Sequence, residues 1–186
     1  KFGDDNLSGK KVLVQGIGHV GETLVDYLTK EGAEVIINDI DKNRLLEVSQ
    51  TYGAKIHTDM NSVYALDVDV YAPCALGATI NDATISQLKA TVIAGAANNQ
   101  LADEVEHSKK LKEKGILYAP DFLINAGGII NVYAELEGYG KDEIFRKTEN
   151  IYNTTLEILT LSEKKNISSH QAALNVAQER IDSKKN

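Results

Sequence analysis

The stretch Lys11–Gly21, which reads KVLVQGIGHVG, decides the fold. Three adjacent apolar residues near its start are typical of a short buried strand. The pattern G-x-G-x-x-G follows at once, and a helical run begins near His19. A glycine turn between a strand and a helix is the usual cradle for a pyrophosphate at a helix N-terminus. Glycines also form turns that bind nothing, but the strand before this turn and the helix after it favour a dinucleotide-binding loop.

Each glycine of this loop has an expected task. Gly16 permits the tight turn, Gly18 lets a pyrophosphate approach the backbone, and Gly21 lets the helix pack against the strand. The free amides and the dipole of the first helical turn favour an anionic ligand. His19 lies in that turn, where it is expected either to contact phosphate or to be an ordinary surface residue.

An acidic residue follows the second expected strand. Asp39 lies 18 residues after Gly21, at the position where a carboxylate hydrogen-bonds the adenosine ribose. Its charge repels a 2′-phosphate, which predicts NAD rather than NADP, although Lys42 and Arg44 lie close enough to weaken that preference. The alternative role for Asp39 is to cap a helix or turn. Asp41 suits the cap, which leaves Asp39 free for the ribose.

The rest of the chain alternates short apolar strands with helical runs. The expected strands are 11–15, 34–38, 54–57, 68–72, 91–94 and 116–119, and the expected helices are 20–30, 41–52, 103–114, 125–138, 141–165 and 168–183. Gly32, Gly53 and Gly115 are expected to end helices. This order predicts an α/β fold with a Rossmann-like, doubly wound, mostly parallel sheet of about six strands, helices on both faces and extra C-terminal helices. One domain over 1–186 is expected, with its core in about 1–140 and the added helices in about 141–186.

Three further loops are expected at the same edge of the sheet. They are Pro73–Gly77, Gly95–Gln100 and Pro120–Asn125, and their small residues and amides suit the close passage of a flat ligand. Cys74 has no paired base in the sequence and is interpreted as a small wall residue rather than a nucleophile. The histidines are not spaced as metal ligands, so no metal site is expected.

Composition narrows the classes of partner. The formal net charge of −7 argues against nucleic acid, which requires clustered Lys and Arg. No apolar run approaches the ~20 residues that span a bilayer. The single cysteine fits a reducing compartment. We therefore expect a cytoplasmic protein without a membrane or nucleic-acid partner. The first residue is not Met and the opening residues are loop-like, which favours a piece of a longer protein.

Five motifs in order give the chain a wider resemblance. The segments NLSGKKVLVQGIGHVG, NDIDKNR, YAPCALGATIND, VIAGAANNQL and YAPDFLINAGGIINVY resemble the NAD-binding domain of the glutamate/leucine/phenylalanine/valine dehydrogenase family, especially its leucine-specific members. The resemblance covers nearly the whole chain. It implies NAD-dependent, reversible oxidative deamination of a branched-chain L-amino acid, leucine or valine, to a 2-oxo acid and ammonia. Phenylalanine is the alternative substrate.

The resemblance also implies roles for individual residues. Ala75 and Leu76 would border the adenine and its ribose, Ala97 and Asn98 the nicotinamide ribose, and Asn125 both the nicotinamide and the α-amino group of the substrate. The full set of cofactor-binding residues carried over by position is Gly16, Ile17, Gly18, His19, Val20, Gly21, Asp39, Ile40, Cys74, Ala75, Leu76, Ala97, Asn98 and Asn125.

Asn125 has two interpretations. Its amide oxygen can accept from a substrate ammonium while its nitrogen donates elsewhere, and Gly127 and Gly128 would keep the crowded backbone free of β-carbons. Alternatively, Asn125 is the N-cap of the helix that follows. The two roles are compatible.

One departure from the family matters. Members carry a lysine pair and a carboxylate on a separate N-terminal domain, and no such glycine-flanked lysine motif occurs in this sequence. No catalytic residue is therefore expected in the chain. We expect it to bind NAD, to share its substrate with an absent N-terminal domain, and to belong to a homo-oligomeric enzyme. The alternative from another class is a non-catalytic nucleotide-sensing domain, such as those that gate potassium transport.

Overall fold

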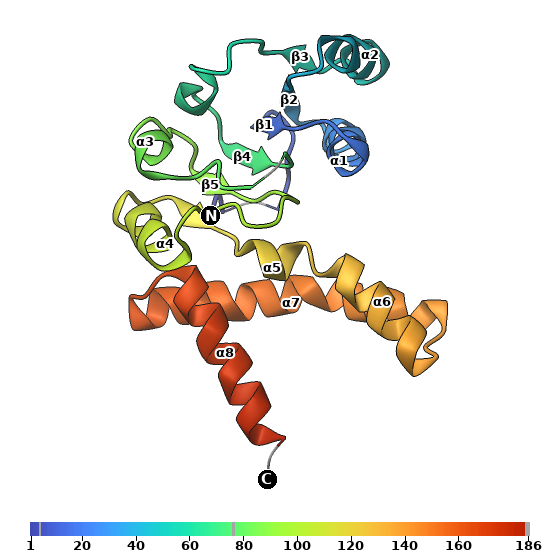
Figure 1. The fold of residues 1–186 in the computed structure, drawn as a ribbon, viewed down its shortest axis with the longest axis vertical. Coiled ribbons are helices and arrows are strands. Elements are labelled where there is room, and N and C mark those ends of the chain that lie inside the picture. The colour runs from blue at the N-terminus through green and yellow to red at the C-terminus, as the bar shows by residue number, and fades with distance from the viewer. Residues whose placement is uncertain (4, 76, 185–186) are drawn as a thin grey trace.

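The chain folds around one parallel sheet. The computed structural model describes residues 1–3, 5–75 and 77–184 (Figure 1). The sheet has the order β3-β2-β1-β4-β5-β6, and each neighbouring pair is parallel. Its strands are β1 (Lys11–Gln15), β2 (Glu34–Asn38), β3 (Lys55–Ile56), β4 (Val70–Pro73), β5 (Val92–Ile93) and β6 (Leu117–Tyr118). This is the doubly wound order of dinucleotide-binding folds, and the predicted fold class is confirmed.

Helices cover both faces of the sheet. They are α1 (His19–Lys30), α2 (Lys42–Tyr52), the 3-10 turn η1 (Val63–Ala65), α3 (Asp82–Ile85), α4 (Glu104–Glu113), α5 (Asp121–Ile124), α6 (Gly127–Glu137), α7 (Lys141–Lys165) and α8 (Ser169–Ser183). Figure 1 shows α1 and α2 on one side of the strands and α3 and α4 on the other. Within the described residues, none of these helices is long and apolar enough to cross a membrane.

The alternation of side chains along β1 produces two cores. Val12 and Val14 point into a cluster with α1 and α2, whereas Leu13 points into a cluster with η1, α3 and α4. All three side chains are at most 1% exposed. Because successive strand residues face opposite sides of a sheet, a run without polar interruption is what a strand covered on both faces requires.

The expected helix ends are largely confirmed. The carboxylate of Asp41 accepts hydrogen bonds from the amides of Asn43 and Arg44 and caps α2. Gly32, Gly53 and Gly115 all have positive φ angles just beyond helices, where a side chain would be strained.

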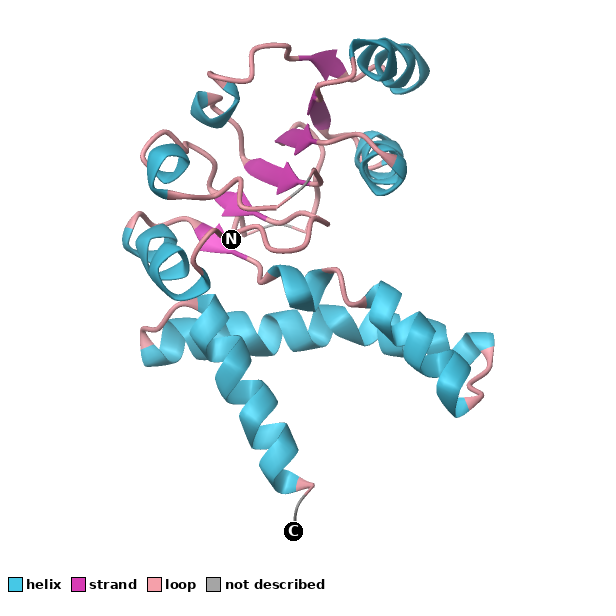
Figure 2. Cartoon of the chain, in the orientation of Figure 1, coloured by secondary structure: helices cyan, strands magenta, loops and turns pink. Residues whose placement is uncertain are grey.

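The last helices form a layer beyond the β6 edge of the sheet (Figure 2). α7 and α8 pack on each other around a small cluster of Ile158, Ala172, Ala173 and Val176. The hydroxyl of Ser169 donates to the carbonyl of Tyr118 at 2.6 Å, which ties the start of α8 to β6. The C-terminal helices therefore extend the sheet domain sideways, and α8 runs away from it.

Two short helices differ from the expectation. The sequence 120–125 was expected to be a loop and 125–138 one helix, but α5 occupies 121–124 and α6 begins at Gly127. α3 was not predicted. Both α3 and α5 have four residues, which is too short to show a helical period in the sequence. Local capping decides α3 instead, because the side chain of Asn81 accepts hydrogen bonds from the amides of Ala83 and Thr84.

Adjacent leucines of α2 offer a direct test of this packing. Leu45 is 2% exposed and Leu46 is 54% exposed. Leu45→Ala should lower the free energy of unfolding by about 2–5 kcal/mol, because it leaves a cavity between α2 and the sheet. Leu46→Ala should change that energy by no more than about 0.5 kcal/mol. Chemical denaturation of both variants measures the difference, and equal losses would contradict the placement of α2.

Candidate functional site

The glycine loop lies where the strand order reverses, between β1 and β4. A β-carbon on Gly21 would stand 2.0 Å from the carbonyl oxygen of Gly16, and one on Gly16 would stand 2.4 Å from the amide nitrogen of Ala75. Gly16 also has a φ of +92°. These two glycines are therefore required by the fold itself, since any side chain would separate α1 and the β4 loop from the turn.

Gly18 differs from its two neighbours in the motif. A β-carbon built there meets no atom within 4 Å, and its φ of −64° and ψ of −165° are open to any residue. Gly18 is the N-cap of α1, and the fold does not need a side chain at this position. The open space in front of this helix N-terminus is where an anion would bind, so the lack of a side chain at Gly18 fits a ligand.

The main chain of the loop is held from both sides at Ile17. The Ile17 amide donates to the Asp39 carboxylate at 2.8 Å, and the Ile17 carbonyl accepts from Nε of Arg44 at 3.3 Å. The side chain of Ile17 is fully buried in the core. The other oxygen of Asp39 accepts from the amide of Asp41 at 2.9 Å. Asp39 therefore has a second role, because this carboxylate also anchors the loop, and its contact with a ribose stays a prediction.

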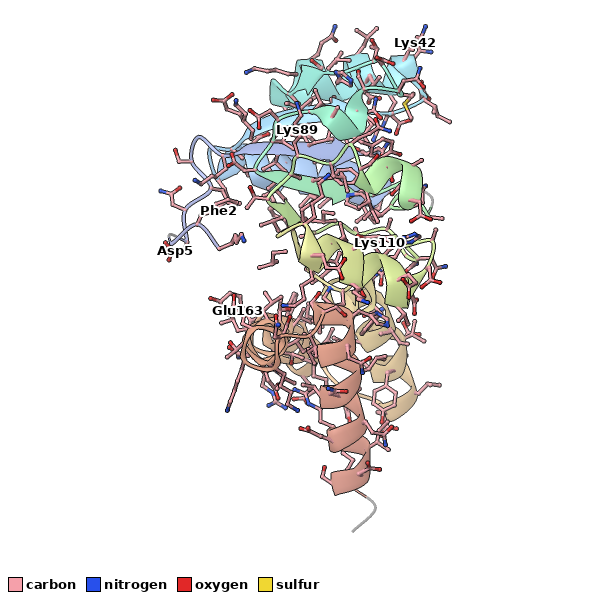
Figure 3. The ribbon with its side chains drawn as sticks, turned by 90° about the vertical axis from the view of Figure 1, so that its left-hand side faces the viewer. Phe2, Asp5, Lys42, Lys89, Lys110 and Glu163 are labelled. Carbon is pink, nitrogen blue, oxygen red and sulfur yellow. The ribbon has the colours of Figure 1, made fainter. Side chains whose placement is uncertain are left out.

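Arg44 is already occupied by acidic neighbours. Its guanidinium forms ion pairs with Glu22 of α1 and with Glu47 of α2, the latter at 2.7 Å. Lys42 stands exposed at the tip of α2 (Figure 3). The charge of Arg44 is thus countered locally, whereas Lys42, three residues after Asp39 in sequence, has an exposed side chain. Ile40, which lies between them in sequence, is 86% exposed.

The loop after β4 forms the other wall of the crevice. Cys74 packs beside Gly21, and burial raises the pKa of its thiol above the usual value. A thiol with a raised pKa is a poor nucleophile near neutral pH, which agrees with the interpretation of Cys74 as a wall residue. Leu76, one of the predicted cofactor contacts, lies outside the described residues.

The side-chain amides of two distant loops meet at the carboxyl edge of the sheet. Nδ2 of Asn125 donates to Oδ1 of Asn98 at 2.6 Å, joining the loop after β5 to the end of α5. Asn125 ends α5, and the residue before α6 is Ala126, which makes no side-chain cap. The N-cap interpretation of Asn125 was therefore wrong. The Asn98–Asn125 pair leaves the carbonyl oxygen of Asn125 available as an acceptor.

An apolar pocket of about 500 Å³ opens between the glycine loop and the loop after β5. Its lining consists of His19, Val20, Thr23, Leu24, Tyr27, Ala94, Gly95, Ala96 and Ile124. The lining includes no carboxylate and no amine among the described residues. Such a pocket can hold a flat ring.

Several of the residues predicted from the sequence lie at this carboxyl edge of the sheet. The structure brings together the glycine loop, Asp39, Cys74, Ala97 and the Asn98–Asn125 pair. It adds residues that the sequence analysis missed, namely Gln100 and Asp121, both buried. Gln100 occurs in a motif already singled out, but nothing in its type indicates burial. Pro120 followed by an acid is a helix-start signal that would have located α5.

Comparison with known proteins places these motifs in a family. Residues 37–186 match the family described as Glutamate/Leucine/Phenylalanine/Valine dehydrogenase. The curated leucine dehydrogenases of Thermoactinomyces intermedius and Bacillus subtilis (strain 168) are each 49% identical to this chain, over 97% of it and 49% of their own length. The chain thus spans about half the length of the curated relatives it matches.

A solved structure shares the fold of this chain. The crystal structure of L-tryptophan dehydrogenase from Nostoc punctiforme is 43% identical, covers 98% of this chain and 54% of that chain, and superimposes with a TM-score of 0.94. The two structures therefore share their fold over nearly the whole of this chain.

The contrast between Gly18 and Gly16 yields a testable difference. Gly18→Val should leave the midpoint of thermal unfolding nearly unchanged, because its side chain enters open space. It should weaken NAD binding at least about tenfold, or ~1.4 kcal/mol, because that space is where a pyrophosphate is expected to bind. Gly16→Val should instead lower the thermal midpoint. Calorimetric titration and thermal unfolding measure both effects, and unchanged NAD affinity in Gly18→Val would place the ligand elsewhere.

Proposed function

This chain belongs to the Glutamate/Leucine/Phenylalanine/Valine dehydrogenase family, and we propose that it is the cofactor-binding half of an NAD-dependent amino acid dehydrogenase of the leucine type. The whole protein would convert a branched-chain L-amino acid to its 2-oxo acid and ammonia. The observation that carries the proposal is the Asn98–Asn125 amide pair, which stands beside an apolar pocket at the end of a dinucleotide-binding crevice. A domain that only senses nucleotides has no need of such a pair.

The residues present fit a bound dinucleotide. The open N-terminus of α1 at Gly18 would receive the pyrophosphate, and Asp39 retains lone pairs that would accept from the adenosine ribose. The apolar pocket beside Val20 and Ala96 would receive the nicotinamide. When bound, NAD supplies the hydride acceptor of the reaction, and the chain supplies its position.

Asn125 would orient the amino acid. Because its Nδ2 donates to Asn98, its carbonyl oxygen faces away from that contact and can accept from an ammonium or amine. Two of the lysines that precede Asn125 in sequence serve structural purposes: Lys114 donates to the carbonyls of Ile85 and Ser86, and Lys110 pairs with Asp82. The group that moves protons would therefore come from the part of the protein outside this chain.

This division of labour predicts that the 186-residue chain binds NAD but produces no NADH. Binding follows from a site contained within one folding unit, and the lack of turnover follows from the lack of a base and an oriented substrate. Calorimetric titration with NAD measures the first, and absorbance of NADH with L-leucine, L-valine, L-phenylalanine or L-tryptophan measures the second.

The same amino acids offered to the full-length protein identify its substrate. NADH production by the isolated chain would disprove the half-site. A full-length protein that binds NAD but gives no signal with any amino acid would instead favour a nucleotide-sensing domain.

Cofactor choice gives an independent prediction. Asp39→Asn should raise the affinity for NADP relative to NAD, because the change removes the charge opposite a 2′-phosphate while an amide oxygen can still accept from Ile17. Asp41→Asn is the matched control: it removes the same charge two residues away, and Asn remains a good cap for α2. Titration with both cofactors measures the ratio of dissociation constants. Equal shifts in the two variants would mean that general charge, not contact with Asp39, decides the preference.

A further inference from the structure

A buried carboxylate lies at the start of α5, the helix that ends at Asn125. Asp121, the first residue of α5, is 8% exposed, and Oδ2 accepts from the main-chain amide of Gln100 at 2.9 Å. Its other oxygen accepts from the amide of Phe122 at 2.7 Å, within α5 itself. One oxygen therefore stabilises the start of the helix, and the other reaches across to the loop after β5.

On its β4 side, this loop is held by main-chain hydrogen bonds to Pro73, Ala78 and Ile80. The side-chain nitrogen of Gln100 donates to the carbonyls of Gly95 and Ala97, at 2.7 and 3.0 Å, and closes the loop on itself. Its side-chain oxygen is buried without a hydrogen-bond partner in the part of the chain that the structure describes. The contact with Asp121 ties the closed loop to α5.

The two ends of α5 contact the same loop. Asp121 and Asn125 are four residues apart, so their side chains project from one side of the single turn. Asp121 binds the amide of Gln100, and Asn125 binds the side chain of Asn98. Both contacts come from α5, so the bond from Asp121 to Gln100 sets where the loop lies relative to α5, and with it the approach of Asn98 to Asn125.

The environment of Asp121 fits a fixed anchor. The amide of Asp121 donates to the hydroxyl of Tyr118 at 3.2 Å, and Tyr118 is 4% exposed. Burial first, and then the charge of Asp121, raise the pKa of Tyr118 well above its usual range. The phenol therefore stays neutral beside the carboxylate.

We propose that Asp121 is a positioning residue of the reaction: through the Gln100 amide it holds the loop after β5 so that Asn98 fixes the orientation of the Asn125 amide toward the substrate amino group. The assignment rests on the proposed function, because the amide of Asn125 matters only if an amino group binds there. Asp121 itself touches neither substrate nor cofactor.

The test is a double-mutant cycle in the full-length protein. Asp121→Ala should lower kcat/KM for the amino acid at least about tenfold, because small displacements of orienting groups cost large factors in rate. The dissociation constant for NAD should stay within about twofold, since the glycine loop is untouched. If Asp121 acts through Asn125, adding Asp121→Ala to Asn125→Ala should reduce kcat/KM by no more than about a further twofold.

A matched control separates positioning from general stability. Asp69 also accepts a hydrogen bond from one main-chain amide, that of Lys11 at 2.8 Å, but it lies at the amino ends of the strands, opposite to the glycine loop. Asp69→Ala should leave kcat/KM near the parent value, and its effect should multiply with that of Asn125→Ala. Multiplying effects for Asp121→Ala and Asn125→Ala would overturn the proposal, as would an unchanged kcat/KM in Asp121→Ala.

A milder variant covers the case in which Asp121→Ala does not fold. Asp121→Asn keeps one side-chain oxygen as an acceptor. Its NH₂ group must then face the main-chain amide of either Gln100 or Phe122. Hydrogen exchange at the Gln100 amide should quicken, together with an intermediate loss of kcat/KM. Quicker exchange without loss of turnover would overturn the proposal. A parent protein that makes no NADH from any amino acid would overturn the proposed function, and this assignment with it.

Discussion

The fold depends on backbone contact at the point where the sheet reverses its order. The first turn of α1 approaches the glycine loop so closely that Gly21 has room for no β-carbon against the carbonyl of Gly16, and Gly16 has none against Ala75. This contact points the N-terminus of α1 at the crevice between β1 and β4. The partial positive charge of the helix end therefore faces the site without any basic side chain. An acidic chain, with a net charge of −7, can bind an anionic ligand in this way.

Carboxylates anchor the two loops at opposite ends of this crevice. Asp39 accepts from the amide of Ile17 in the glycine loop, and Asp121 accepts from the amide of Gln100 in the loop after β5. Each carboxylate lies just after a strand and holds a loop that follows a different strand. Hydrogen bonds to charged acceptors are stronger than those between neutral groups. The loops are thereby fixed in place while their tips, at Gly18 and Asn98, remain exposed.

Sequence reasoning located the strands, the long helices and the glycine loop because each depends on a local pattern. The apolar run of β1 and the glycine spacing are both visible within about ten residues. The N-cap interpretation of Asn125 failed because it assumed one helix from 125 to 138, and the break between α5 and α6 is set by packing against α7 rather than by composition. The loop contacts of Asp39 and Asp121 lie 22 and 21 residues away in sequence, so no local pattern reveals them.

The surface beyond Asn125 agrees with the proposed half-site. Ile129, Val132, Tyr133 and Leu136 are spaced as one stripe along α6, and they are 71, 59, 49 and 80% exposed. A stripe of this kind normally faces a core, and contiguous exposed apolar surface in a protein marks an interaction site. Helical stability comes mainly from burial of such a face. α6 starts two residues after the amide that would orient the substrate. A further part of the protein that covered this stripe would therefore also enclose Asn125, and enclosure is what a reaction needing a dry, oriented amino group requires.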